Sequence, residues 1–400
     1  MVLRASGLDP VTESLMQWIQ QQAEDRREDY DMTRRYYGGE HDTAVTDRLK
    51  KFLPPRLAFR DNFMNVVVDS LAERLKVIGF DTEDEAFGEW AWDMWQKNRM
   101  DYTQVVVHTE AIMLGDSYLL CDWDAKKERP RWTHQMPEMI IPHYDEVNRS
   151  IDWVSKKWLQ HPRIGDEPET RLNIYHDDRV EKYVARGGVW AKYQDEEDEA
   201  WPVPWLDRAG EPLGVPIIHF RNRPLGGDFG QSEIINVIPM QDLLNKTLID
   251  LTMILDTLAF PQRYTLNVAH NSSRLEIMPG SVAEFHSEYD GGQVGQWQAA
   301  SVEGPLKAIE SLVQHIAGTT RTPQHLFQIM GGMPSGEALK TAESGLVNKA
   351  QQRMVNFGNA WEDCLMMALR IQTAFGATVA DAEEVMLETT WDLSLIHISE

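Results

Sequence analysis

The chain has 400 residues and a formal net charge of −24 at pH 7, with 42% apolar and 26% charged residues. Its length is enough for two or three domains with cores of their own, and its composition is ordinary for a globular protein. The acidic balance excludes a protein that grips nucleic acid over its whole surface, because such binding needs Lys and Arg to neutralise phosphates. It is compatible with a protein that lets DNA pass without holding it, and also with acidity that serves only solubility.

Two cysteines, Cys121 and Cys364, form no metal or redox motif and favour a reducing compartment over a disulfide-built secreted protein. The N-terminus lacks the apolar core of a signal peptide. The most lipid-like stretch, 248–260, is interrupted by Asp250 and Asp256 and is too short to span a bilayer. No membrane partner is expected.

Helical spacing dominates the first 115 residues. One helix is predicted over 11–37 with a glycine stop at Gly38, and a second over about 59–77. A third helix over about 86–115 is expected to break near Asn98. Three tryptophans of this helix are expected to fill the core and an interface rather than form a ligand cage: Trp90, Trp92 and Trp95.

From Ser117 the pattern changes to short β-rich segments separated by turn residues, which predicts an antiparallel meander. Val215 to Phe220 is expected to add one more buried strand. The acidic run 195–199 is expected to be a solvated loop. The meander segments are 118–123, 131–134, 139–143, 151–159, 170–176, 179–185 and 189–193.

The second half of the chain returns to helices. A long helix is predicted over about 232–259, with Pro239 expected to kink or restart it. A polar insert over 262–300 carries strand-like pieces at 263–268 and 282–286. A further helix is predicted over about 302–317.

A glycine- and methionine-rich segment, 324–334, then leads into a helix of about 40 residues, roughly 60 Å long. Ser335 is expected as its N-cap, and Glu337 places a carboxylate at the positive end of the helix dipole. A rod with a mobile loop at its tip is unusual in a small enzyme and suits a ring around a channel. Its apolar residues recur at helical spacing: Leu339, Ala342, Leu346, Ala350, Met354, Phe357, Trp361, Leu365 and Leu369.

Catalytic motifs are missing from the sequence, which has no Walker phosphate loop, GxSxG, HExxH, CxxC or GxGxxG pattern. The triplet Asp228-Phe229-Gly230 matches the metal-binding motif of protein kinases, but the HRD and VAIK motifs that accompany it in kinases are missing. The stretch 226–230 is interpreted as a glycine turn. His134 and His143 could approach each other across strands but fall short of a metal site. No catalytic residue, cofactor or metal is predicted, although a hydrolase with two carboxylates distant in the chain stays open.

The order of these pieces resembles the portal (head-to-tail connector) proteins of tailed double-stranded DNA bacteriophages. The resemblance extends over nearly the whole chain, and Asn65 with 68–80, and the stretch 111–118, fit the N-terminal wing of that family. In the second half, the stretches that carry it are Gly214-Val-Pro-Ile-Ile-His-Phe220, Gly230-Gln-Ser-Glu-Ile234, Met240-Gln-Asp-Leu-Leu-Asn-Lys246, Ala259-Phe-Pro-Gln-Arg263 and Ser335-Gly-Glu-Ala-Leu-Lys340.

The resemblance implies an α+β fold with a wing, a two-helix stem, a clip insert, a tunnel loop and a long wing helix. The family usually continues into a helical crown, which is expected here to be partial or missing. Residues 393–400 resemble a translated sequencing adapter and are given no function. The implied divisions are wing 1–230 (helical over 1–115, antiparallel meander over 116–230), stem helix 231–261, clip 262–300, second stem helix 301–322, tunnel loop 323–335, long wing helix 336–376, and 377–400 as the start of a crown or an artefactual tail.

The resemblance also implies a function. The chain would be a structural, non-enzymatic subunit of a homo-oligomeric ring of twelve copies at one vertex of the viral capsid. The ring would form the channel for double-stranded DNA during genome packaging and ejection. It would dock the terminase and the neck or head-completion proteins, and it would contact the major capsid or scaffold protein. Its place would be the virion, after assembly in the host cytoplasm.

The segment 324–334 would face the DNA, because neutral hydrogen-bonding groups, soft thioethers and glycines touch a duplex without gripping it. Alternatively, its apolar residues pack into a neighbouring subunit. Two other functions are retained: an acidic cytosolic hydrolase with an aromatic-rich β domain, and another phage morphogenesis protein such as a capsid-associated adaptor. The DNA-facing residues implied by the resemblance are Gln324, His325, Gln328, Met330, Gly331, Gly332 and Met333.

Overall fold

The computed structural model describes residues 8–42, 60–160, 168–195, 200–259, 263–266, 293–296, 301–327, 336–380 and 385–395. The chain divides into two compact units, each of which is described by itself. Unit 1 is Met1–His41, Asn62–Ile238 and Ala317–Glu400, and unit 2 is Asp42–Asp61 and Pro239–Ile316. Helices and sheets are both present, in agreement with the α+β prediction.

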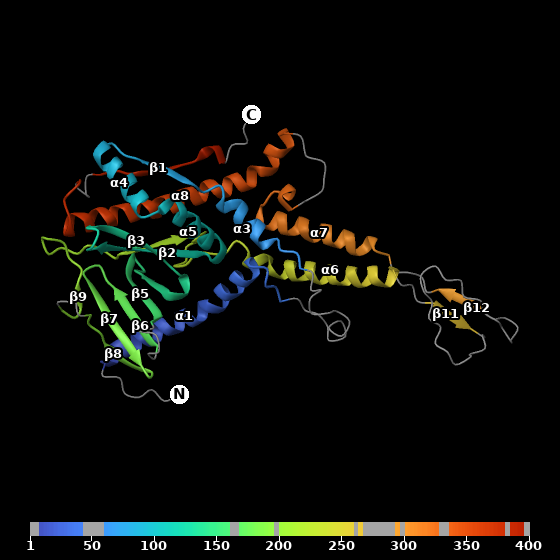
Figure 1. Cartoon of the computed structure of the whole chain (residues 1–400), viewed down its shortest axis with the longest axis horizontal. Coiled ribbons are helices and arrows are strands. Elements are labelled where there is room, and N and C mark those ends of the chain that lie inside the picture. Colours follow the sequence, from blue (N-terminus) through green and yellow to red (C-terminus); the bar gives the residue numbers. More distant parts are fainter. Residues whose placement is uncertain are drawn as a thin grey trace. The chain divides into compact units, whose positions relative to one another are not determined.

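Unit 1 contains long helices, the strand pair β1-β13 and two larger antiparallel sheets (Figure 1). One sheet has three strands in the order β10-β2-β3, and the other has the order β4-β5-β6-β7-β8, with β9 paired to β7. The described helices are α1 (Pro10–Tyr37), α3 (Met64–Ala72), α4 (Glu85–Lys97), α5 (Met100–Leu114) and α8 (Gly336–Phe375). The described strands are β1 (Val77–Asp81), β2 (Asp116–Asp124), β3 (Arg129–Gln135), β4 (Ile140–Tyr144), β5 (Ile151–Gln160), β6 (Glu169–Tyr175), β7 (Arg179–Arg186), β8 (Val189–Lys192), β9 (Val203–Pro204), β10 (Ile217–Arg221) and β13 (Glu388–Trp391).

The two sheets are stacked between α8 and α1 (Figure 1). The first six residues of β2 are all buried. Since successive side chains of a strand point to opposite sides, both faces of β2 are covered. Cys121 faces α8, where its sulfur lies 3.5 Å from that of Cys364. Tyr118 and Leu120 face the other sheet and share one apolar cluster with Val154 of β5. The opposite side of that second sheet packs on α1 through a cluster of Met16, Ile19, Ile141, Trp153, Leu172, Ile174 and Tyr183.

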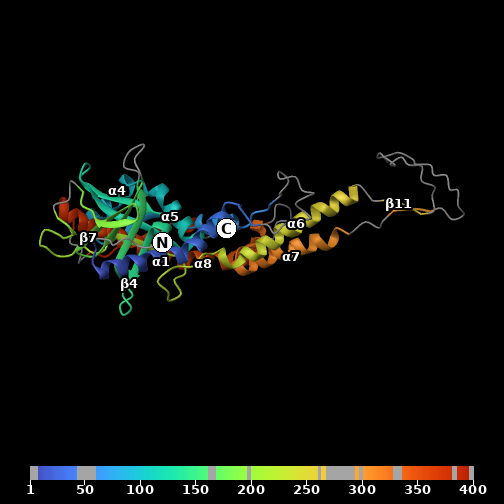
Figure 2. The same cartoon turned by 90° about the horizontal axis from the view of Figure 1, so that it is seen from below.

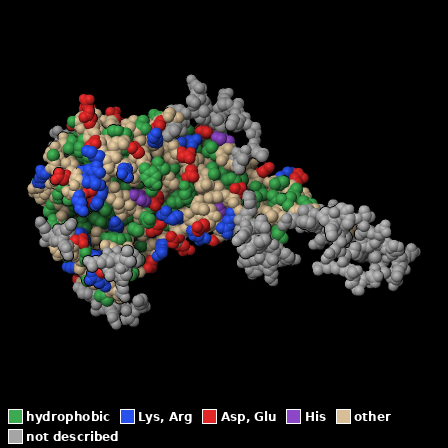
Figure 3. Space-filling model, in the orientation of Figure 1, with side chains coloured by type: hydrophobic (Ala, Val, Ile, Leu, Met, Phe, Trp, Pro, Cys, Tyr) green, Lys and Arg blue, Asp and Glu red, His purple; other side chains and the backbone are tan. Residues whose placement is uncertain are grey.

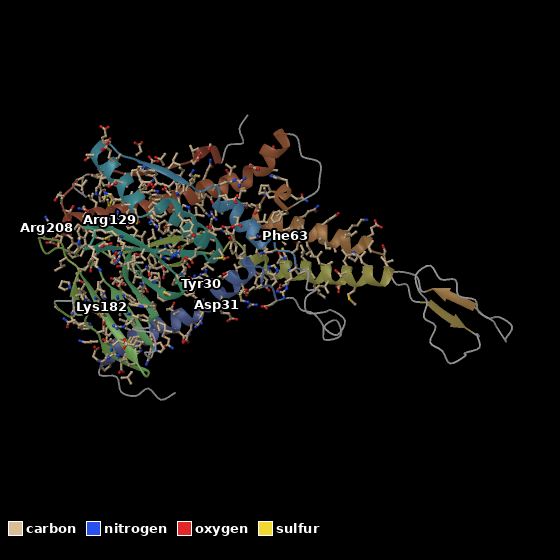
Figure 4. The ribbon with its side chains drawn as sticks, in the orientation of Figure 1. Tyr30, Asp31, Phe63, Arg129, Lys182 and Arg208 are labelled. Atoms are coloured by element: carbon tan, nitrogen blue, oxygen red, sulfur yellow. The ribbon has the colours of Figure 1, made fainter. Side chains whose placement is uncertain are left out.

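Helix α8 is the central element of the core. Trp361 is buried, and its ring meets Trp95 at 4.8 Å and Phe220 at 4.7 Å, both edge to face. Strands β2, β3, β10 and β13 all contact this helix. At its C-terminal end Arg208, labelled in Figure 4, donates to the carbonyls of Ala374 and Gly376. A cation at that position favours the helix, because the last carbonyls carry partial negative charge.

The apolar face of α8 also buries one neutral histidine. The indole N–H of Trp361 donates to Nε2 of His108 at 3.0 Å, and Nδ1–H of His108 donates to the carbonyl of Leu75 at 3.0 Å. Burial lowers the pKa of His108 from 6.5 to about 4. The folded protein therefore resists protonation of a ring that the unfolded chain protonates readily.

This histidine predicts a pH dependence of stability. The pKa of His108 is lower in the folded state, so its contribution is complete above pH 6.5 and is lost as the pH falls from 6.5 towards 4. At 1.36 kcal/mol per pKa unit the loss is about 3 kcal/mol. Urea unfolding of the wild type and of His108→Gln at several pH values checks it. The wild type should lose about 3 kcal/mol more than the variant across this window, and parallel pH profiles would contradict the assignment.

Several local predictions differ from the structure. The helix expected over 59–77 is only α3, and residues 77–81 form β1, which pairs antiparallel with β13. The helix expected from about 232 is a 3-10 turn, η2 (Ile235–Val237), followed by α6 (Ile238–Ala259), so the restart predicted at Pro239 is confirmed: Pro239 lies in the first turn of α6, where a missing backbone N–H has no consequence. Within the segment 377–400, residues 388–391 form β13, which pairs with β1, contacts α8 and lies in unit 1.

Unit 2 is built around a helical hairpin. Helix α6 leads to the antiparallel strands β11 (Arg263–Leu266) and β12 (Gln293–Gln296), and α7 (Glu303–Thr320) returns. The two helices lie next to each other in both views (Figures 1 and 2). Within the unit, Asn245 of α6 accepts from the backbone N–H of Asp61 at 2.9 Å. The predicted strand piece 263–268 is confirmed over 263–266, and the piece 282–286 lies outside the described residues.

Candidate functional site

The start of the predicted tunnel loop is fixed to unit 1 by aromatic packing. Residues Gln324–Phe327 form a single turn of 3-10 helix, η3. The Phe327 ring is buried and meets the ring of Phe63 edge to face, with 5.5 Å between their centroids. Phe63, labelled in Figure 4, immediately precedes α3. This geometry adds electrostatic attraction to apolar burial. The predicted tunnel loop therefore begins at a turn, η3, that is held in place against α3.

An ionic contact supports the same base. Nε2 of His325 lies 3.3 Å from Oε1 of Glu343 on α8, and Oε2 of Glu343 lies 3.2 Å from the Arg74 guanidinium. His325 is half-buried against this carboxylate, whereas Gln324 is exposed. The imidazole is thus directed at α8 within its own subunit.

The other predicted DNA-facing residues are not described by the structure. They are Gln328, Met330, Gly331, Gly332 and Met333, which lie between η3 and the start of α8. Their contact with DNA stays a prediction. The proposed N-cap Ser335 also lies outside the described residues.

A second ionic cluster holds α8 against the segment that follows β10. Glu233 accepts from Lys349 at 2.8 Å and from the Arg353 guanidinium, and all three side chains are buried. Nε of Arg353 also donates to the side-chain carbonyl of Asn222 at 2.7 Å. Burial alone would raise the pKa of Glu233, but the positive charges of Lys349 and Arg353 hold it below its ordinary value. Both cations therefore depend on one carboxylate.

A third buried network lies at the start of β2, around Asp116. Its carboxylate accepts from Arg26 at 2.6 Å, from the Tyr30 hydroxyl at 2.8 Å and from Nε2 of His219 at 2.8 Å. The fourth donor is the backbone N–H of Gly230, at 2.7 Å. Burial would raise the pKa of Asp116, but the hydrogen bond from His219, the charge of Arg26 and the backbone hydrogen bond from Gly230 keep it low.

His219 in this network is a neutral imidazole. Burial lowers its pKa in spite of the adjacent carboxylate. With Nε2–H donating to Asp116, Nδ1 accepts the hydroxyl proton of Tyr144 at 2.8 Å. Asp116 is therefore neutralised by Arg26, and every polar atom of the histidine ring has a partner. The network ties together α1, both sheets and the loop 222–231 (Tyr30 is labelled in Figure 4).

Gly230 is required here for space rather than for its backbone angles. A Cβ atom on this residue would lie 2.0 Å from the carbonyl oxygen of Gly115 and 2.6 Å from that of Asn222. The turn predicted over 226–230 does contain a left-handed glycine, Gly226, with φ of 81°. The triplet ending in Gly230 thus has a structural explanation, since Phe229 also lies under the Arg26 guanidinium at 3.7 Å.

Sequence reasoning did not identify Glu233, Lys349, Arg353 or Asp116 as important positions. A signal was present in α8, because Lys349 and Arg353 are four residues apart on the apolar face. Two cations on a buried face predict a buried anion. The sequence does not say which of 63 acidic residues supplies it.

The described residues contain no group of three or more His, Cys, Asp or Glu side chains able to hold a metal ion. The two histidines considered for such a site have separate partners. His134 bonds to Glu110 at 2.6 Å, and His143 stacks on Trp153 at 4.9 Å. In the part of the chain that the structure describes, no helix combines the length and apolarity needed to cross a bilayer.

Comparison with known families gives one assignment that spans the chain. The family model for phage portal proteins of the SPP1 Gp6-like type matches residues 16–397. The chain therefore belongs to the phage portal protein family, whose members are structural components of the virion. The alternative of an acidic hydrolase finds no support in this assignment.

Individual relatives carry the same name. The portal proteins of Mycobacterium phages D29 and L5 are each 25% identical over 346 residues, covering 82% of this chain and 68% of theirs. Among solved structures, a chain of the neck of an empty gene transfer agent particle has a TM-score of 0.48 at 11% identity, covering 88% of this chain and 85% of its own. A chain of the native particle's virion has a TM-score of 0.45 at 11% identity, covering 82% and 80%.

Proposed function

We propose that the chain is the repeating subunit of a closed ring of twelve copies at one capsid vertex. The ring forms the channel through which double-stranded DNA is packaged and ejected, and it docks the terminase and the neck proteins. In this proposal unit 2 supplies the stem and clip, unit 1 supplies the wing, and 324–334 is the tunnel loop. The family assignment supports the structural role. The helix–insert–helix order of unit 2 supports its assignment as stem and clip.

The observation that carries the ring is the exposed apolar surface of the unit 2 hairpin. Leu255 and Leu258 of α6 are 50% and 36% exposed, and they lie three residues apart on one helix face. Leu243 of α6 and Leu306 of α7 are also exposed. Identical copies arranged head to tail would cover this surface, because heterologous contacts generate rings when their rotation closes.

The surface charge of the described residues fits a passive conduit. Figure 3 shows acidic and basic side chains together over the visible face of unit 1. The chain as a whole carries −24. Acidic walls would disfavour lasting contact with phosphates, so a duplex would slide rather than stall.

The assembly is tested by the double substitution Leu255→Glu with Leu258→Glu. Mass photometry of the wild type should show particles near 550 kDa, twelve times the 46.0 kDa chain, and negative-stain images should show rings with a central hole. The double variant should shift to monomers, since a carboxylate buried in an apolar contact is strongly unfavourable. Leu159→Glu, which alters a 59% exposed leucine of β5, is the matched control and should assemble normally. A variant that forms rings as well as the wild type would reject the hairpin as the interface.

A further inference from the structure

Unit 1 contains a charged cavity of about 570 Å³ that the proposed function leaves without a role. Four parts of the chain form its walls: the turn after β10, Glu233, the C-terminal end of α7 with Arg321, and the middle of α8. Its charged lining residues are Arg223, Glu233, Arg321, Lys349 and Arg353. Four cations and one carboxylate give it an excess of positive charge in a strongly acidic protein.

The single carboxylate is already used by two of the cations. Oε2 of Glu233 accepts from Lys349, and Oε1 accepts from Arg353 and from the side-chain amide of Asn222 at 3.2 Å. Among the described residues no carboxylate lies within ion-pair distance of Arg223 or Arg321. The two outer arginines therefore have no anionic partner on the described part of the chain.

The four cations also act on one another. Burial is the largest cause that lowers the pKa of Lys349, and the charges of Arg353 and Arg223 lower it further. For Arg353, burial is again the largest cause that lowers the pKa, and the charges of Arg223 and Arg321 add to it. Glu233 already offsets part of this repulsion for Lys349 and Arg353, and an anion that entered the cavity would offset the rest by adding an attraction to all four cations.

The backbone is strained at Arg223 and Arg321. Arg223 and Arg321 have φ angles of 50° and 53°, in the left-handed region that residues with a Cβ atom avoid. Only five non-glycine residues of the described chain have positive φ, and these are two of them. Strained backbone of this kind clusters at ligand-binding positions. Arginine is also the side chain whose planar fork best matches the oxygens of a phosphate.

We propose that this cavity binds a phosphate group, supplied by the phosphodiester backbone of double-stranded DNA. The binding of phosphate follows from the cavity alone, whereas DNA as its source rests on the proposed function. Since the chain is otherwise acidic, the cavity is a local point of attraction. Inorganic phosphate shares the same chemistry and is the other possible source.

The test uses the full chain and the double variant Arg223→Asn with Arg321→Asn. Asparagine tolerates left-handed backbone, so the variant removes two charges without adding strain. Fluorescence anisotropy with a labelled 20-base-pair duplex at low salt measures DNA binding. Calorimetric titration with sodium phosphate measures the free anion. Arg99→Asn is the matched control, because Arg99 is also exposed with a left-handed φ of 58° but lies outside the cavity lining.

The proposal expects the double variant to bind the duplex at least tenfold more weakly than the wild type. The salt dependence of its binding should fall by the equivalent of one or two phosphate contacts, while Arg99→Asn keeps wild-type affinity. Duplex affinity that is absent in the wild type, or equal in the wild type and the double variant, overturns DNA as the source. If phosphate titration also shows no difference between them, the cavity is not a phosphate site. Mass photometry of the same samples reports ring assembly separately, so a failed ring and a failed cavity are distinguishable.

Discussion

Replacing Asp116 by alanine is expected to lower the free energy of unfolding of unit 1 by about 3–5 kcal/mol. The carboxylate is fully buried and receives four hydrogen bonds, from Arg26, Tyr30, His219 and the backbone of Gly230. Without it the Arg26 guanidinium loses its neutralising charge, and three other donors lose their acceptor. Urea unfolding at pH 7, followed by tryptophan fluorescence, measures the loss.

The matched control is Asp122→Ala on the same strand. Asp122 pairs with Arg131, but their side chains are 30% and 50% exposed. Exposed ion pairs contribute about 0–1 kcal/mol, so this substitution should be nearly neutral. Equal losses for the two variants would show that the network around Asp116 does not stabilise the fold beyond an ordinary surface contact.

Replacing Trp361 by alanine is the second substitution with a large expected effect, about 3–5 kcal/mol. The indole fills the centre of the contact between α8, α4 and β10 through Trp95 and Phe220. Its loss leaves a cavity, and it also removes the donor that satisfies Nε2 of His108. Chemical unfolding of the variant and the wild type under identical conditions gives the difference.

Two further variants separate the contribution of the hydrogen bond from that of packing. Trp361→Phe keeps an aromatic ring but removes the donor, so it should cost about 1–3 kcal/mol, the penalty for an unsatisfied buried acceptor. Trp18→Ala removes a 39% exposed tryptophan of α1 and should cost less than either. If Trp361→Phe were as damaging as Trp361→Ala, the hydrogen bond rather than the packing would dominate.

Periodicity predicted much of the local structure. The helix over 11–37 is confirmed as α1, and the expected break at Asn98 is confirmed by the end of α4 and the start of α5. The backbone breaks at Arg99, which is left-handed, and the side chain of Asn98 bonds to the carbonyl of Met94 beside it. The antiparallel meander and the 40-residue helix from 336 are also confirmed.

Pairings between residues distant in the chain could not be predicted from the sequence. The strand over 77–81 was not predicted, because the partner that makes these residues a strand is β13, far along the chain. Glu233 meets Arg353 across 120 residues, and Asp116 meets Arg26 across 90. Periodicity shows that a face is buried, but it does not show what lies against it.

The two cysteines illustrate the same limit. Spacing gave no reason to connect Cys121 with Cys364, which are 243 residues apart. In the structure both thiols are free and buried, and they touch where β2 crosses α8. Burial also raises the pKa of Cys364, which keeps it an unreactive thiol.

The pairing of β1 with β13 has a consequence for biosynthesis. A ribosome that has just released β1 still has roughly 300 residues to add before β13 emerges, which takes about 15–60 s at 5–20 residues per second. During that interval the nascent chain carries a strand with an unsatisfied edge. Such an edge invites pairing with other polypeptides. Chaperone occupancy of polysomes stalled between β1 and β13 should therefore exceed that of polysomes stalled after residue 391 has left the exit tunnel.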